Sequence, residues 1–205
     1  ESNASPFLCV KTKNLLAGVH QKEILFWSLD NEIPVKIVQL NYDSATYLTN
    51  SDKKLFVYYK NGFIDVVDLE SFEIVSTFTI HKKNDVVYKA FFNDDLKFFI
   101  PKEIIKEYHF VKGFENFPLA NYELFLNRPD VILSKLGYTS PELVEVYKKA
   151  HLKRLENSGY SEKTDYLSIK KPTLLLANRN TIQPISKSNN LTLNFKTEEP
   201  LDSLL

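Results

Sequence analysis

The chain has 205 residues, with 26 basic and 26 acidic side chains and a formal net charge of zero. A balanced charge provides no general electrostatic attraction to nucleic acid or to an anionic membrane. Hydrophobic residues make up 43% of the chain, which is enough for a sizeable core, but no apolar run is long enough to span a membrane. The single cysteine, Cys9, excludes an intrachain disulfide and leaves the redox compartment open. The first four residues, ESNA, are typical of the remnant of a cleaved tag, so we expect the native fold to begin after them.

Short runs rich in Val, Ile, Phe, Tyr and Leu alternate with turn residues over residues 11–100, a pattern typical of β-strands. The runs repeat at an offset of about forty residues: ILFWSLD at 24–30 aligns with IDVVDLE at 64–70, VKIV at 35–38 with VSTF at 75–78, and KNLL at 13–16 with KKLF at 53–56. DLKF at 95–98 begins a third copy. Asn61 and Gly62 predict a tight hairpin turn, because both residue types tolerate positive φ. A period of this length is typical of four-stranded propeller blades.

The aligned runs resemble the WD-repeat family, whose blades carry an aromatic–acid dipeptide at the end of one strand. Trp27 and Ser28 keep the aromatic residue at this place, and Val67 and Asp68 keep the acid. The resemblance implies antiparallel propeller blades, of which the chain has room for about two, whereas propellers have about four to eight. The blades would then be completed by the rest of a longer propeller or by another copy of the chain. A plain antiparallel meander with a coincidental repeat is the alternative.

The stretch NRPDVILSKLG at 127–137 has the signals of a helix with both of its ends. Asn127 or Arg128 would cap the helix, Pro129 suits its first turn, and Asp130 is an acid that the helix dipole favours there. Gly137 is placed to end the helix in a left-handed turn. These four residues from Asn127 to Asp130 therefore predict a helix anchor, in which the Arg128 side chain reaches back to a carbonyl or an acid on the last blade.

A second helix is predicted to begin at Ser140, with serine as the cap and Pro141 in the first turn. Apolar side chains then follow at helical spacing and form one stripe: Leu143, Val144, Tyr147, Ala150, His151 and Leu155. A single histidine on such a stripe is more often a packed residue than a metal ligand, and we expect this of His151.

Motifs across residues 100–205 resemble the region that follows the propeller in bacterial multidomain proteins joining WD repeats to a caspase-like peptidase domain. They include HFVKG at 109–113, NRPD at 127–130, PEL at 141–143 and YKKA at 147–150. In that family a small immunoglobulin-like β segment comes next, and here the strand-like runs PTLLLA at 172–177 and LTLNF at 191–195 stand in its place. The resemblance implies that the peptidase domain would lie beyond residue 205.

Together these patterns predict a mainly β chain with a helical segment. We expect WD-repeat-like, antiparallel propeller-type blades over residues 5–100, about two of them and incomplete. A connector and helical clasp follows over 101–160, and the start of a small β-sandwich-like segment over 161–205.

No pattern in the sequence indicates catalytic, cofactor or metal chemistry. The five glycines are too scattered for a phosphate-binding loop, and the four histidines have no partner at metal-ligand spacing. Cys9 stands in an apolar, strand-like stretch without the catalytic pattern of the caspase-like family, so we expect neither an enzyme nor a bound cofactor. Acidic doublets such as Asp94 and Asp95 fit no calcium loop and are typical of solvated turns.

We therefore expect a non-catalytic scaffold for protein–protein contact, the WD-repeat and linker portion of a bacterial caspase-like multidomain protein. Its partner would be another protein or a second copy, bound through the blade edges, with no nucleic acid. The candidate interaction surface consists of Trp27, Tyr58 and Tyr59, because one ring of each aromatic doublet in a strand should face outward. Two alternatives stay open: an accessory fragment of a cysteine peptidase whose catalytic domain is absent, and a small-ligand-binding β domain with a pocket among Tyr42, Tyr47, Tyr58 and Tyr59.

Overall fold

The computed structural model describes residues 8–12, 15–30, 33–165, 174–177 and 193–197. The chain divides into two compact units, Glu1–Glu162 and Lys163–Leu205. The predicted boundary at 100/101 therefore lies inside the first unit, while the one at 160/161 lies close to the division between the units. No helix in the described ranges is long and apolar enough to cross a membrane.

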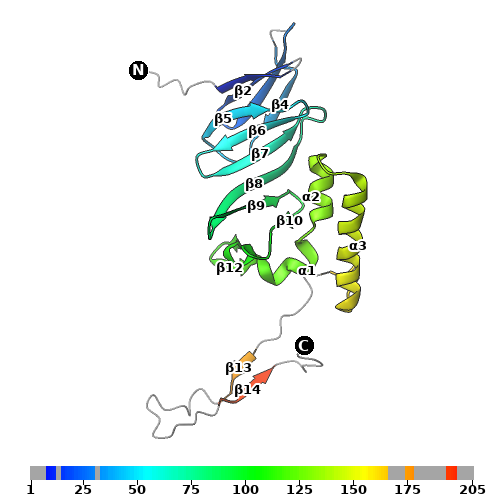
Figure 1. The fold of residues 1–205 in the computed structure, drawn as a ribbon. Helices are drawn as coiled ribbons and strands as arrows, with labels where there is room; N and C mark the ends of the chain where they lie inside the picture. The colour runs from blue at the N-terminus through cyan, green and yellow to red at the C-terminus, as the bar shows by residue number, and fades with distance from the viewer. Residues whose placement is uncertain (1–7, 13–14, 31–32, 166–173, 178–192, 198–205) are drawn as a thin grey trace. The chain divides into compact units, whose positions relative to one another are not determined.

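The first unit contains two antiparallel meanders (Figure 1). Sheet A has four strands in chain order: β1 (Leu8–Lys11), β2 (Leu15–His20), β3 (Glu23–Ser28) and β4 (Lys36–Gln39). Sheet B has six strands in chain order: β5 (Ala45–Asn50), β6 (Lys54–Tyr59), β7 (Phe63–Asp68), β8 (Ile74–Lys83), β9 (Val86–Phe92) and β10 (Phe98–Phe99). The expectation of a mainly β chain built from antiparallel strands is confirmed.

Sheet A and the first four strands of sheet B are one unit built twice. Leu25 pairs with Gly18 on one side and Ile37 on the other, and Asp65, forty residues later, pairs in the same way with Val57 and Thr77. Val57 follows Gly18 by 39 residues, because the turn between β6 and β7 is one residue longer than that between β2 and β3. KNLL and KKLF are therefore out of register by one residue in the sequence alignment.

The third copy predicted from DLKF at 95–98 does not start a new sheet. Strand β8 is ten residues long and pairs with β9 over seven positions, and β10 then pairs with β9. The link from β8 to β9 is a two-residue turn, Asn84 and Asp85, and both have positive φ, which suits a tight hairpin. Because the hairpin returns the chain directly beside β8, strands β9 and β10 extend sheet B instead of starting a third sheet.

The two faces of sheet B are covered by different layers. Its first face packs against sheet A in a core that contains Val19, Ile24, Phe26, Leu55, Val57 and Tyr59. Its second face packs against α2 (Pro129–Leu136), where Ile132 and Leu136 contact Ile64, Val66 and Phe78. Alternation along β6 and β7 divides their side chains between the two cores.

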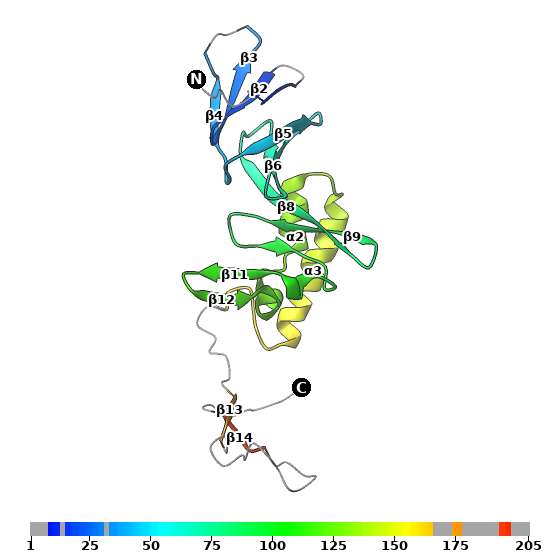
Figure 2. The ribbon, with the colours of Figure 1, turned by 90° about the vertical axis from the view of Figure 1, so that its left-hand side faces the viewer.

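The helical segment lies beside the β8–β10 part of sheet B in both ribbon views (Figures 1 and 2). It begins with η1 (Ile105–Glu107), the hairpin of β11 (His109–Lys112) and β12 (Glu115–Pro118), η2 (Leu119–Tyr122) and α1 (Glu123–Leu126). The two predicted helices are confirmed as α2 and α3 (Pro141–Asn157). Gly137 ends α2 with a left-handed φ of 73°, and the Ser140 hydroxyl caps α3 by accepting from the Leu143 N–H.

In the second unit, β13 (Leu174–Leu176) pairs antiparallel with β14 (Phe195–Thr197). The first of these falls within the predicted strand at 172–177. The second begins at the last residue of the run predicted at 191–195 and continues past it. Residues 166–173, 178–192 and 198–205 of the predicted β-sandwich-like segment lie outside the described residues.

Candidate functional site

Residues 127–130 attach α2 to the edge of sheet B through Asn127 and the backbone of Arg128. The buried Asn127 amide nitrogen donates to the Ile100 carbonyl at 3.2 Å, and its Oδ1 accepts from the Ile100 N–H at 3.4 Å. The backbone N–H of Arg128 donates to the Phe98 carbonyl at 2.7 Å. Asn127 thus provides the hydrogen bonds that a neighbouring strand would provide, and the edge after β10 is satisfied.

The Arg128 side chain does not reach the last blade, contrary to expectation. It donates two hydrogen bonds to Asp130, from Nε at 2.9 Å and from Nη2 at 2.7 Å, and its Nη1 lies 3.5 Å from Glu162. Asp130 lies in the first turn as predicted, but it is only 4% exposed and is a buried partner of Arg128. Burial alone would raise the pKa of Asp130, but the hydrogen bonds from Arg128 lower it overall. Pro129 occupies the first turn of α2 as predicted.

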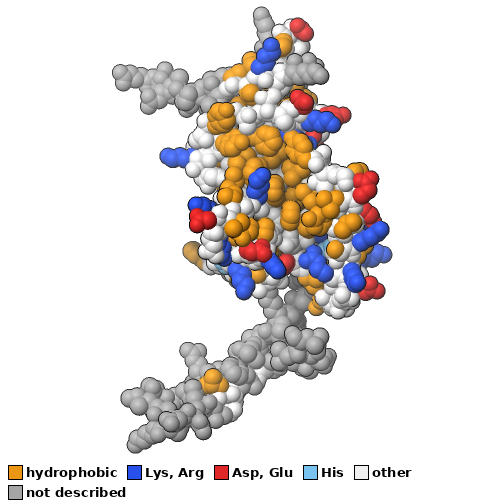
Figure 3. Space-filling model, viewed as in Figure 1, with side chains coloured by type: hydrophobic (Ala, Val, Ile, Leu, Met, Phe, Trp, Pro, Cys, Tyr) orange, Lys and Arg blue, Asp and Glu red, His pale blue; other side chains and the backbone are white. Residues whose placement is uncertain are grey.

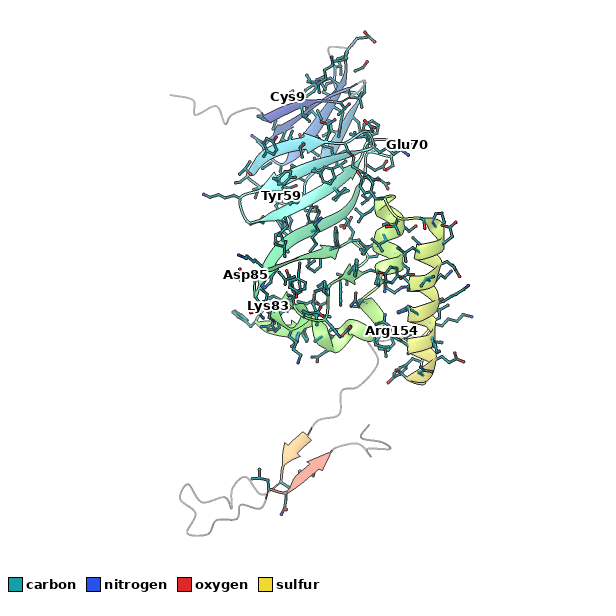
Figure 4. All side chains as sticks on the ribbon, in the orientation of Figure 1. Cys9, Tyr59, Glu70, Lys83, Asp85 and Arg154 are labelled. Carbon is teal, nitrogen blue, oxygen red and sulfur yellow. The ribbon has the colours of Figure 1, made fainter. Side chains whose placement is uncertain are left out.

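His151, on α3, faces this ion pair and is 2% exposed. Its Nδ1 has no hydrogen-bond partner among the described atoms. Burial, followed by the positive charges of Arg128 and Arg154, lowers the pKa of His151 to about 4; Figure 4 shows Arg154 on the same helix. In the described part of the chain no group of three or more His, Cys, Asp or Glu side chains could hold a metal ion.

The three predicted interaction residues do not form one surface. Trp27 pairs with Leu16 on the face of sheet A that points away from sheet B. Tyr58 packs on the α2 side of sheet B, whereas Tyr59 faces sheet A and is 4% exposed. Tyr59, labelled in Figure 4, is therefore a core residue, because it packs in the core that sheet A and sheet B share.

The same alternation separates the four tyrosines that were considered for a ligand pocket. Tyr42 and Tyr59 contact each other at 5.2 Å between ring centroids, on the sheet A side of sheet B. Tyr47 and Tyr58 contact each other at 5.6 Å, and Tyr58 packs on the opposite face. The four rings therefore do not line one cavity.

The outer face of sheet A carries a row of small and apolar side chains across all four strands. The row consists of Cys9, Gly18, Leu25 and Ile37, which are cross-strand partners. Cys9 is exposed on β1 (Figure 4) and Ile37 is 50% exposed. In sheet B the row at the same strand positions is Leu48, Val57, Asp65 and Thr77, and its members are all buried. In sheet A, Leu25 is partly buried and Gly18 is buried, so Cys9 and Ile37 are the exposed members of the row. The face is therefore covered in sheet B and only partly covered in sheet A.

A second row runs across all six strands on the α2 side of sheet B. It consists of Tyr47, Tyr58, Ile64, Phe78, Phe91 and Phe99. The rings follow one another at centroid distances of 5.1 Å for Phe78 and Phe91 and 6.2 Å for Phe91 and Phe99, and Tyr147 of α3 adjoins Phe99 at 6.3 Å. Tyr47, at the far end, is 60% exposed. Figure 3 shows hydrophobic side chains gathered over this face next to α2.

Sequence reasoning missed a buried carboxylate, Asp65, in the middle of sheet B. Its Oδ2 accepts from the Tyr59 hydroxyl at 2.6 Å, and its Oδ1 accepts from the Thr77 hydroxyl at 2.5 Å and the Asn41 amide at 3.3 Å. The available signal was the one acid within the apolar run FIDVV at 63–67. A polar residue in a buried strand requires hydrogen-bond partners, so such a position predicts a polar network.

The sequence matches no family model, and no curated protein matches it either.

Proposed function

We propose that the chain is a non-catalytic scaffold for protein–protein contact, and that the outer face of sheet A packs against another four-stranded sheet of the same kind. The observation that carries this proposal is the repeat itself. The face of sheet B that is equivalent to the outer face of sheet A is buried by sheet A. The row through Leu25 and Ile37 therefore has the position of an interface between repeats.

The repeat also indicates what the occupant is. In the interface between the two repeats, the inner face of sheet A packs against the first face of sheet B. A partner for the outer face of sheet A would have to offer a face like the inner face of sheet A, and in this chain sheet B already covers that face. The corresponding face of sheet B is partly covered by α2. A second copy therefore offers no fully open surface of the required type, and the occupant is a further repeat, as in a WD-type propeller.

The wider role rests on the resemblance of residues 100–205 to the region after the propeller in bacterial WD-repeat proteins with a caspase-like peptidase domain. We infer that the scaffold serves beside such a peptidase, with α2 and α3 as the clasp on the last sheet. A native gene that does not continue into a domain with a catalytic histidine and cysteine would contradict this inference.

Trp27 is the single tryptophan of this chain and lies on the proposed interface. Its signal in the full-length protein is taken as the difference from a Trp27→Phe variant, so it reports on the docking. We expect acrylamide to quench Trp27 fluorescence severalfold less in the full-length product of the native gene than in this chain alone. Leu25→Lys in the full-length protein should restore quenching, because a charged side chain in a buried face is costly. Ile80→Lys, at an exposed position of β8, is the matched control and should leave the quenching unchanged.

Equal quenching in both proteins would contradict the proposed interface. Sedimentation of this chain over a range of concentrations distinguishes the occupant. A dimer abolished by Leu25→Lys would show that a second copy, and not a further repeat, covers the face.

A further inference from the structure

A cavity of about 470 Å³ lies on the side of sheet B that faces sheet A, between β7–β9, the β9–β10 turn and β11. No residue of sheet A is among those that line it. Five aromatic rings contribute to its wall: Tyr42, Phe63, Phe92, Tyr108 and Phe110. Its volume is in the range of pockets that hold small ligands.

The rings form a connected array. Tyr42 and Phe63 are stacked, with centroids 5.0 Å apart, Phe63 and Phe92 meet edge to face at 6.5 Å, and Phe92 and Tyr108 lie 5.8 Å apart. Aromatic faces carry the negative part of the ring quadrupole, so a wall of this kind favours a cation or an apolar group over an anion.

Behind this wall lies the negative charge of Asp65. Two of the three donors to its carboxylate, Asn41 and Thr77, also line the cavity. All three donors are neutral, and none of the ion pairs in the described ranges includes Asp65. Burial, followed by the negative charge of Asp65, raises the pKa of the neighbouring Tyr42. A carboxylate compensated only by neutral hydrogen bonds keeps a negative potential in its surroundings.

Two charged side chains at the wall do not change this balance. Asp94 and Lys97 both line the cavity and carry opposite charges. Together they add no net formal charge to the wall, so the charge that distinguishes this side of the sheet is that of Asp65.

We propose that this cavity binds a small organic cation, such as an alkylammonium compound. The cationic group lies toward Asn41 and Thr77, in the field of Asp65, and the apolar body packs against the rings of Phe63, Phe92 and Tyr108. Anionic ligands of the same shape are excluded by the same field. The site is independent of the proposed docking face, because no residue of the outer face of sheet A takes part in it.

The test uses this chain and a pair of probes of matched shape: choline and its uncharged isostere 3,3-dimethyl-1-butanol. Isothermal titration calorimetry, supported by chemical-shift changes at Asn41 and Thr77, is expected to show choline binding at least about tenfold more tightly than the isostere. Equal affinity, tighter binding of the neutral probe, or no binding of choline would overturn the proposal.

Asp65→Asn removes the charge and keeps the shape of the side chain, so it should bring the affinities for the two probes to within about twofold of each other. Asp94→Asn is the matched control at the wall; it should preserve most of the preference for choline. Binding of the neutral isostere shows whether the Asp65→Asn cavity is intact. An Asp65→Asn protein that still binds the isostere and keeps the full preference would also overturn the proposal. Should that variant fail to fold, the comparison of the two probes on the unaltered protein still decides.

Discussion

Lys54 and Asp68 show what burial does to charged side chains in this protein. The Lys54 side chain is 7% exposed, donates to Asp68, and lies 3.5 Å from the carbonyl of Lys135 at the end of α2. Burial would raise the pKa of Asp68, but hydrogen bonds from Lys54 and from the N–H groups of Ser71 and Glu70 lower it to about 2. Arg128 and Asp130 form a second ion pair with little exposure to solvent, at the start of α2. Each of these four charged side chains has an opposite charge within hydrogen-bond distance, which offsets the cost of removing it from water. Asp65 is held differently, by three neutral hydrogen-bond donors.

His151 is the buried titratable group that lacks a hydrogen bond at one ring nitrogen, and it should make stability depend on pH. Its pKa falls from 6.5 to about 4 on folding, so the folded state favours the neutral ring. The resulting stability is fully present above pH 6.5 and is lost as the pH falls toward 4. The shift corresponds to about 3 kcal/mol. Arg128 and Arg154 act in the same direction as burial, and Asp130 and Glu162 oppose it.

Urea unfolding at several values between pH 7 and pH 4 measures this loss. We expect His151→Leu to flatten the pH dependence relative to the unaltered protein, since the ring that takes up a proton on unfolding is then absent. His20→Leu, at an exposed position, is the control and should keep the original slope. A His151→Leu protein with the same slope would show that His151 does not cause the dependence.

At the scale of elements, α2 is held to sheet B by apolar contact on one side and by backbone hydrogen bonds at its start. Ile132 and Leu136 fill the space over Ile64, Val66 and Phe78. The start is fixed by the Asn127 amide on Ile100 and by the backbone of Arg128 on Phe98. The helix therefore closes the edge of the sheet as well as covering part of its face, and it leaves no free strand edge there for aggregation.

Asn127→Ala should loosen this attachment, because it leaves the buried N–H and carbonyl of Ile100 without partners. We expect a loss of about 1–3 kcal/mol in the free energy of unfolding. Hydrogen exchange at the Ile100 amide should become faster than at the amides within β6 and β7. Asn121→Ala, which alters an exposed asparagine of η2, serves as the control. An unchanged free energy of unfolding would show that the Asn127 amide does not hold the helix.

At the scale of the whole molecule, the first unit contains both cores and all the elements from β1 to α3. The contacts of sheet A, sheet B and α2 lie within residues 8–162. The predicted blades and the predicted clasp are therefore parts of one folding unit, joined by the attachment of α2 to β8 and β10.

The protein ending at Glu162 is accordingly expected to fold cooperatively. A single thermal transition, with the same midpoint by far-ultraviolet circular dichroism and by Trp27 fluorescence, would be the result for a two-state unit. A protein ending at Leu126, before α2, is the comparison and should lose this transition, since the Ile64 and Phe78 core would be open to water. Two separate transitions in the longer protein would mean that blades and clasp unfold independently.

Much of the strand and helix pattern could be predicted because its signals are local. Pro129, Gly137 and Ser140 act through backbone geometry within one turn, and the structure has helix ends where they predict them. The repeat could be found because each copy has the same four strands. The sheet to which the third copy belongs could not be predicted. The choice between a new sheet and a longer sheet B depends on how far β8 extends, and the repeat does not specify this length. The candidate surface failed at Tyr59 for a similar reason: alternation predicts two faces, but not what covers each.

The sequence by itself determined the repeated strands, their antiparallel order and the two helices α2 and α3, because hydrophobic period, turn chemistry and helix caps act over short distances. The tertiary structure decided which faces are buried. It made Asp130, predicted only as a first-turn acid, a buried partner of Arg128. It also placed Asp65 behind an aromatic cavity and left Ile37 of the outer face of sheet A exposed. Burial is a property of pairs of layers that are distant in the chain. Only the packing of sheet A and α2 on sheet B could set it.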